Sequence, residues 1–108
     1  MDNRLQLGHE RLDCYQLGVA VARWAAQQTF PTHRKHLRDQ LVRAADSVAL
    51  NIAVGSGQSG DARRNHYRIA MGSAAEVAAV IDLADFTDGA DRQEEVRRIT
   101  AMLFKMSR

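Results

Sequence analysis

Residues 37–55 read LRDQLVRAADSVALNIAVG, and the pattern of this stretch decides the fold class. On a helical wheel of about 100° per residue, five of its apolar side chains fall within about 80° of arc. They are Leu37, Leu41, Ala45, Val48 and Ile52. A stripe of this width is typical of an amphipathic helix that buries one face. Gly55 and Gly57 follow as candidates for a left-handed C-cap, so the sequence predicts a helix over residues 33–55.

Three further segments show the same periodicity. Residues 60–87 carry on one face Tyr67, Met71, Ala74, Ala78 and Ile81, widened by Ala70, Val77 and Ala84. Residues 91–107 carry Val96, Ile99, Leu103 and Met106. Residues 10–28 form a first helix that ends before Pro31, because proline disfavours helix in the residue before it. Connections of about three to six residues favour antiparallel neighbours. The sequence therefore predicts an all-α, up-down-up-down antiparallel four-helix bundle, with one domain over residues 1–108.

Composition agrees with helices packed on small side chains. Apolar residues make up 45% of the 108 residues and aromatics only 6%, with a single proline. Cys14 is the only cysteine, which rules out an intramolecular disulfide and suits a reducing compartment. The first ten residues lack the apolar core of a signal peptide, and no run of about 18 apolar residues is present. We therefore expect a cytoplasmic protein that does not contact a membrane, in which Cys14 is a small buried hydrophobe.

The helix predicted over residues 10–28 has two apolar stripes. The first is assigned to the core of the bundle and consists of Leu12, Tyr15, Val19, Ala22 and Ala26. The second lies roughly opposite and consists of Cys14, Leu17, Val21 and Trp24. A helix in a bundle of four normally shows one apolar face, and Trp is enriched at protein interfaces. We therefore predict self-association through the second stripe. The alternative is a wide buried face in a tightly wrapped monomer.

Several ordered motifs carry a resemblance to a known family. They are Phe30-Pro31, LRDQLVRAA over residues 37–45, SVALNIAVG over residues 47–55 and IAMGSAAE over residues 69–76. In this order and spacing, the stretch from Leu12 to Glu76 resembles the 23S rRNA-intervening-sequence proteins. Relatives of that family include the accessory variability determinant proteins of diversity-generating retroelements. One departure stands out, because Val54 occupies the position of the glutamate in the family's N-I-A-E-G motif.

The resemblance implies a four-helix bundle that assembles into a ring, commonly a pentamer, without enzymatic activity. It also implies a connection with nucleic acid, since members lie within ribosomal RNA genes and the retroelement relatives partner a reverse transcriptase. A function that depends on the family's glutamate is not carried over, because that carboxylate is missing from this chain.

The motifs suggest a polar clamp between the second and third helices. Gly72 in mid-helix costs about 1 kcal/mol of helix propensity, which is tolerable where a neighbouring helix approaches closely. An antiparallel third helix would bring Ser73 and Glu76 near Asn51, and buried polar groups need partners. We predict an Asn51–Ser73–Glu76 network, with Arg43 as a further candidate, that sets the register of the two helices. A ligand site is the alternative.

Charge is distributed in blocks along the chain. The net charge is only +2, but residues 31–68 carry +4, residues 69–91 carry −5 and residues 92–108 carry +3. The candidate nucleic-acid contacts are Arg64, Arg68, Arg97, Arg98, Lys105 and Arg108. In a ring, such charges add up to a multivalent surface whose binding to phosphates is sequence-indifferent and salt-sensitive. No aromatic platform for single strands is evident. An ordinary solvated face paired with Asp and Glu is the alternative.

Signatures of catalysis and of metal binding are missing. The glycine-rich stretch at residues 55–60 lacks the preceding strand and the Lys-Ser/Thr ending of a phosphate loop. His33 and His36 have no third ligand nearby in sequence, and the Glu-x-x-His pattern of di-iron bundles is absent. We therefore expect no catalytic residue, metal or cofactor. The sequence favours a non-enzymatic homo-oligomeric bundle that binds RNA or DNA non-specifically. The alternative is a scaffold that recruits a partner protein without binding nucleic acid.

Overall fold

Four α-helices make up most of the computed structural model, which describes residues 7–108. Their bounds are α1 Asp13–Ala26, α2 Lys35–Ser56, α3 Gly60–Ala84 and α4 Gly89–Met106. Short 3-10 turns, Gly8–Arg11 and Thr32–Arg34, precede α1 and α2. Residues 7–108 contain no strand, so the all-α prediction is confirmed. The prediction about a signal peptide falls mainly on residues 1–6, which lie outside the described residues.

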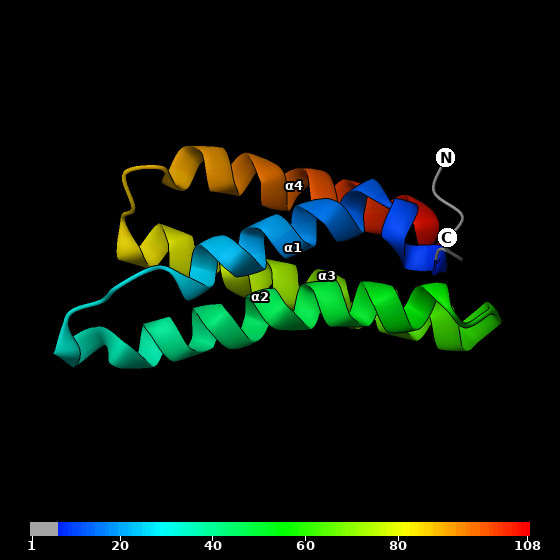
Figure 1. Cartoon of the computed structure of the whole chain (residues 1–108), viewed down its shortest axis with the longest axis horizontal. Helices are drawn as coiled ribbons and strands as arrows, with labels where there is room; N and C mark the ends of the chain where they lie inside the picture. Colours follow the sequence, from blue (N-terminus) through cyan, green and yellow to red (C-terminus); the bar gives the residue numbers. More distant parts are fainter. Residues whose placement is uncertain (1–6) are drawn as a thin grey trace.

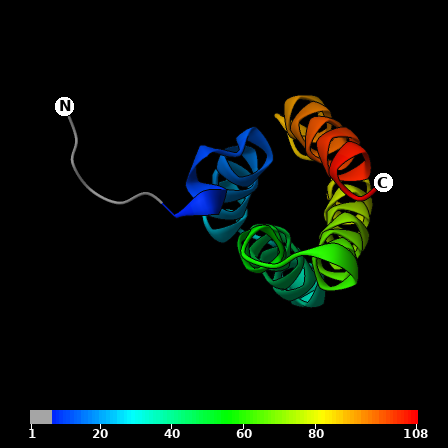
Figure 2. The ribbon, with the colours of Figure 1, turned by 90° about the vertical axis from the view of Figure 1, so that its right-hand side faces the viewer.

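The helices form the predicted antiparallel bundle. Each helix runs opposite to the one before it, so the start of α1 and the end of α4 lie at the same end (Figure 1). Seen along the bundle, α1, α2, α3 and α4 follow one another around a common interior (Figure 2). Contacts between α1 and α4 join the first helix to the last. The connections between successive helices are short. Each helix therefore packs antiparallel to the helix before it.

Helix ends differ from the prediction by a few residues. Helix α3 stops at Ala84 because Asp85 takes a left-handed conformation, with φ 57°, and its N–H donates to the carbonyl of Ile81. Within residues 7–108, the other residue with positive φ is Gly60, at 59°. The prediction of a left-handed C-cap at Gly55 or Gly57 is therefore wrong. Gly55 lies inside α2 and is buried.

The core matches the predicted stripes of three helices. All five predicted residues of α2 are buried, as are the main stripe positions of α3 and α4. The largest side chains that are completely enclosed are Leu41, Ile52, Ile99, Leu103 and Val77. Burial of such side chains stabilises the fold by about 25 cal/mol for each Å² of apolar surface removed from water.

The orientation of α1 was predicted wrongly. Cys14, Val21 and Trp24, assigned to an interface between subunits, are no more than 7% exposed within a single chain, and Leu17 is half-buried. The stripe assigned to the core is half-buried at best, and Ala26 is exposed. Gly18 explains the choice of face, since a Cβ there would lie 3.6 Å from the Cα of Ala49. Small residues on this side let the backbone of α2 approach α1, and the alternative of a tightly wrapped monomer describes this helix better.

Neither membrane-spanning helices nor clustered metal ligands occur in the described part of the chain. None of the four helices combines the length and the hydropathy needed to cross a bilayer. Within residues 7–108, no three His, Cys, Asp or Glu side chains gather closely enough to share a metal ion. Cys14 is buried beside the sulfur of Met106 at 3.9 Å, and this burial raises the pKa of its thiol.

Candidate functional site

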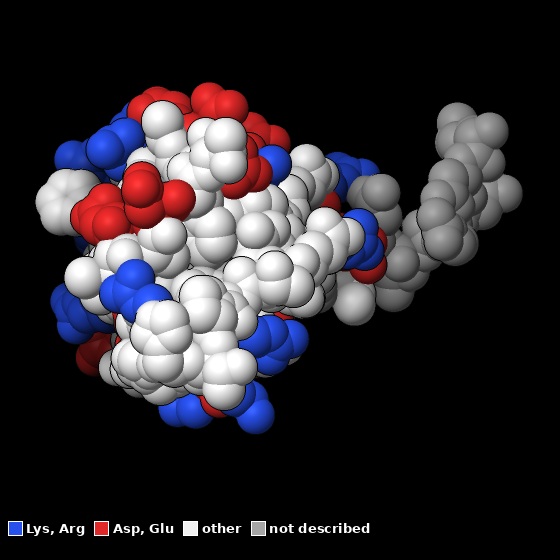
Figure 3. Space-filling view, turned by 90° about the vertical axis from the view of Figure 1, so that its left-hand side faces the viewer, with Lys and Arg blue, Asp and Glu red and all other residues white. Residues whose placement is uncertain are grey.

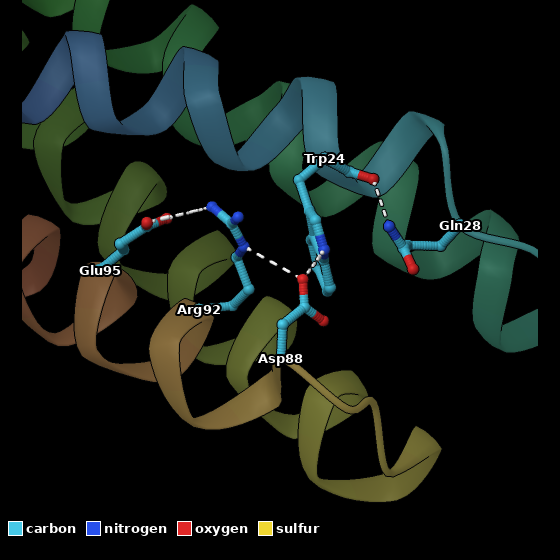
Figure 4. A network of polar contacts seen from close by, with 5 residues as sticks. All are labelled: Trp24, Gln28, Asp88, Arg92 and Glu95. Atoms are coloured by element: carbon cyan, nitrogen blue, oxygen red, sulfur yellow. Dashed lines mark hydrogen bonds and ion pairs between the residues drawn. The ribbon is translucent and has the colours of Figure 1, made fainter.

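A polar and aromatic cluster joins α1 to α4 (Figure 4). The indole N–H of Trp24 donates to Oδ2 of Asp88 at 2.8 Å. The same carboxylate oxygen lies 3.6 Å from Nε of Arg92, whose Nη1 donates to Glu95 at 2.9 Å. The guanidinium of Arg92 also lies over the Trp24 ring, 5.6 Å from its centroid. Trp24 therefore buries its ring and still satisfies its one donor, which buried indoles normally require.

Two phenylalanines complete this cluster. The ring of Phe86 meets the Trp24 ring edge to face at 4.9 Å, and Phe30 meets Phe86 at 5.5 Å. The polar side chains of the cluster contact one another within the subunit, although Nε of Arg92 is buried without a hydrogen bond and has only the 3.6 Å ion pair with Asp88. The cluster is therefore a structural link between the first and last helices. The sequence could not predict it, because Trp24 and Asp88 are 64 residues apart.

A second polar network lies between α2 and α3. Ser73 Oγ lies 2.8 Å from Ser47 Oγ, and Asn51 Nδ2 donates to the Ser47 carbonyl at 2.9 Å and to its hydroxyl at 3.1 Å. Oδ1 of Asn51 lies 3.0 Å from Nδ1 of His66. The predicted link between Asn51 and Ser73 therefore exists, but it runs through Ser47. Ser47 and His66 were not predicted as members, although Ser47 lies one turn before Asn51 on the same helical face.

Two other parts of the predicted clamp are wrong. Glu76 is exposed and has no polar partner within residues 7–108, and the same holds for Arg43. Gly72 is exposed, and a Cβ added there would meet nothing within 4 Å. No helix of the same subunit therefore approaches closely over Gly72. The polar network is a clamp made by Ser47, Asn51, His66 and Ser73.

Large apolar side chains are exposed on α2 and α3 near this clamp, and Leu50 also lines a shallow pocket between α1 and α2. Leu50 is 64% exposed, Val54 47% and Ile69 43%. Leu50 and Val54 are one turn apart on α2, while Ile69 is one turn before Ser73 on α3. We call these three residues, together with the open Gly72, the α2–α3 face. Val54 contributes apolar surface here at the position where the family motif has a glutamate.

Three of the six predicted basic residues line a groove between α3 and α4. Small and apolar side chains form most of this α3–α4 groove, and its lining includes three of the predicted cations, Arg97, Lys105 and Arg108. Arg64 and Arg68 lie seven residues before Met71 and Ala75, which also line the groove. Seven residues are about two helical turns, so both arginines extend the same side of α3. Arg98 does not line the groove, and its prediction as a member of one shared surface is not supported.

Pairing with carboxylates leaves part of this charge free. Arg64 forms an ion pair with Asp61 and lowers the pKa of that carboxyl. Arg97 lies 3.5 Å from Glu94, and both side chains are mostly exposed, so this pair is weak. Arg98, Lys105 and Arg108 form no ion pair with any residue between 7 and 108. Two unpaired cations therefore stand at the α4 C-terminal end of the groove, Lys105 and Arg108.

An exposed aromatic ring lies among these cations. Phe104 lines the α3–α4 groove and is 63% exposed. The exposure of this ring was not evident from the sequence, because one phenylalanine on a helix rich in polar residues does not reveal whether its ring is buried. In the structure this one aromatic side chain shares the groove with Arg97, Lys105 and Arg108.

One side of the opposite end of the bundle is acidic. Figure 3 looks at the end where α3 connects to α4, and Asp and Glu side chains gather over one side of it. The acidic residues in this part of the sequence are Asp82, Asp85, Asp88, Asp91, Glu94 and Glu95. Asp82 lines the groove and accepts from Gln93 at 2.7 Å. The groove therefore runs from a carboxylate near the acidic end to Lys105 and Arg108, where an anion would be attracted.

Comparison with known proteins agrees with the motifs. The family model of the 23S rRNA-intervening sequence protein matches residues 10–108 of this chain. This match covers all four helices and the α3–α4 groove. No curated protein and no solved structure matches the chain.

Proposed function

Because the chain belongs to the family of 23S rRNA-intervening sequence proteins, we propose that it is a non-enzymatic, self-associating helical bundle that binds nucleic acid through the α3–α4 groove. One observation carries this proposal. Arg97, Lys105 and Arg108, predicted from sequence alone, line one groove, and two of them have no carboxylate partner in the described part of the chain. Unpaired cations along one surface are the usual basis of phosphate binding.

The expected binding is electrostatic and sequence-indifferent. Each phosphate that a subunit neutralises releases condensed counterions, which makes affinity fall steeply with salt. About three contacts in one subunit would lower the affinity roughly 20- to 40-fold between about 50 and about 200 mM salt. Several copies on one assembly add their contacts, so self-association would turn a weak site into a useful one.

The sequence predicted self-association through the first helix, and we propose instead that it occurs through the α2–α3 face. The residues that first suggested it, such as Trp24, lie in the core and are not available. Leu50, Val54 and Ile69 remain as large apolar side chains exposed on a single chain. The open Gly72 beside them allows another backbone to approach closely. The ring of five implied by the family resemblance is the assembly we expect.

Removing the groove's charge tests the proposed binding. The variant Arg97→Ala/Lys105→Ala/Arg108→Ala is expected to lose at least about tenfold in affinity for RNA and for duplex DNA at about 50 mM salt, and its salt dependence becomes shallower. Fluorescence anisotropy of labelled oligonucleotides measures both. A matched control is Arg34→Ala/Lys35→Ala/Arg38→Ala at the start of α2, which should bind like wild type. No binding by the wild type at low salt would reject the proposal and leave the protein-recruiting scaffold as the better account.

Charge on the α2–α3 face tests self-association. The variant Leu50→Asp/Ile69→Asp is expected to sediment as a single chain while the wild type sediments as a larger particle, because buried unpaired carboxylates oppose assembly. Both positions are exposed in the subunit, so circular dichroism should remain helical. Phe104→Asp is the control, since it places a charge on an equally exposed apolar position of α4. A wild type that sediments as a monomer, or an assembly broken by Phe104→Asp alone, contradicts the proposed face.

A further inference from the structure

We propose that the α3–α4 groove is selective for unpaired nucleotides, with a base stacked on Phe104 and the neighbouring phosphates held by Arg97, Lys105 and Arg108. This inference rests on the proposed nucleic-acid binding and adds the type of strand that is bound. It depends on the one exposed aromatic ring in the groove and on the chemistry of the surfaces around that ring.

Phe104 lies between the cations along α4. Arg97 is seven residues before it, so both side chains lie on one face of the helix, and Arg108 follows just beyond the helix end and lines the same groove. At 1.5 Å rise per residue, Arg97 is about 10 Å away along the axis. Lys105 follows Phe104 directly and lines the same groove. The ring therefore has positive charge on both sides along the direction of the groove.

The floor of the groove accepts apolar rings better than phosphates. Its α3 side is formed largely by Met71, Ala74, Ala75 and Ala78, and Ala101 adds another small side chain from α4. The whole groove has a volume of about 960 Å³, and the Phe104 ring lines part of it. A phosphate gains nothing from such a surface, whereas the flat face of a base can cover both the ring and the alanines.

A duplex cannot use this arrangement. Its bases are already stacked inside the helix, so it presents phosphates and groove edges to the protein, and the Phe104 ring stays uncovered. An unpaired strand can rotate a base outward onto an aromatic side chain while its phosphates reach nearby cations. The basic groups alone would bind both strand types, so the preference for unpaired nucleotides depends on Phe104. Stacking on a phenyl ring accepts any base, and the binding remains independent of sequence.

Substitutions at Phe104 separate stacking from charge. Binding of the full-length protein to a labelled oligouridine of about 20 nucleotides and to a duplex of equal length is measured by anisotropy at about 50 mM salt. Wild type is expected to favour the single strand. Phe104→Leu keeps the apolar bulk but should lose about 5- to 150-fold in affinity for the single strand, with unchanged affinity for the duplex. Phe104→Trp should retain or increase single-strand binding. Leu83→Ala, which removes an exposed apolar side chain outside both the groove and the α2–α3 face, is the control.

The outcomes distinguish this inference from the proposed function. If the duplex and the single strand bind equally and Phe104→Leu changes neither, the stacking role is rejected while nucleic-acid binding stands. Equal losses for both strand types would also reject it, because selectivity would then not arise at Phe104. If neither oligonucleotide binds at low salt, the proposed function itself is rejected. That result would instead favour a groove that binds an acidic amphipathic segment of a partner protein.

Discussion

Replacing Trp24 by alanine is expected to lower the free energy of unfolding of the isolated subunit by about 3–5 kcal/mol. The substitution removes a ring that packs edge to face on Phe86 and leaves a cavity between α1 and α4. It also removes the indole N–H donor from Asp88, whose carboxylate then retains only Arg92 nearby. A domain of this size has about 5–15 kcal/mol of stability, so the variant should be largely unfolded well below the wild-type midpoint.

Two further variants divide this effect into its parts. Trp24→Phe keeps most of the packing but loses the hydrogen bond, and we expect a loss of about 1–3 kcal/mol. Asp88→Asn keeps an acceptor for the indole and weakens the ion pair with Arg92, and it should cost less than Trp24→Ala. Urea denaturation followed by circular dichroism measures all three, because the tryptophan signal is lost in two of them. If Trp24→Ala unfolded like wild type but changed the sedimentation coefficient, Trp24 would belong to an interface after all.

The orientation of α1 shows where periodicity alone stops being informative. Helices α2, α3 and α4 each have one apolar stripe, and in each case that stripe faces the core as predicted. Helix α1 has two, and the one assigned to the core because it spans a narrow arc is the less buried of them. Backbone approach decided the outcome, since Gly18 lies between Cys14 and Val21 and lets α2 come close. A stripe with small residues at its centre is a better sign of a helix–helix contact than the number of apolar side chains.

The groove could be predicted in part, because it depends on helix geometry. Seven-residue spacing places Arg64 and Arg68 in line with Met71 and Ala75, and antiparallel packing brings the start of α3 near the end of α4. The exposure of Phe104 depends instead on how far α3 and α4 separate. Four alanines line the groove, and their small side chains leave it unfilled. No local sequence pattern predicts the resulting distance between the two helices.

The two glycines of the family motifs provide the other large prediction, because the same substitution should act with opposite sign at each. A Cβ on Gly55 would lie 2.9 Å from Cε1 and 3.0 Å from Cδ1 of Tyr67, and 3.1 Å from Cβ of His66. Tyr67 is buried, so its ring cannot swing into solvent. Gly55→Ala is therefore expected to lower the free energy of unfolding by roughly 1–2 kcal/mol, because the cost of overpacking exceeds the gain in helix propensity.

Gly72→Ala is the matched control on α3. A Cβ there meets nothing within 4 Å, so the substitution should raise the free energy of unfolding by about 1 kcal/mol through helix propensity alone. Urea denaturation at low protein concentration, where assembly is weak, compares the two variants on single chains. A stabilising Gly55→Ala would mean that Tyr67 does not lie against α2 as described.

The Gly72→Ala variant also tests why a glycine occupies an exposed position in the middle of α3. Within the subunit, Gly72 only lowers stability, and nothing packed against it compensates for that loss. If a second copy packs over the α2–α3 face, the glycine allows its backbone to approach closely. The packing between the two copies would then offset the helix propensity that Gly72 loses in the single subunit. Gly72→Ala should then raise the stability of the single chain while lowering the fraction of assembled protein at equilibrium. A variant that is more stable and assembles as well as wild type would show that no copy approaches closely at this point.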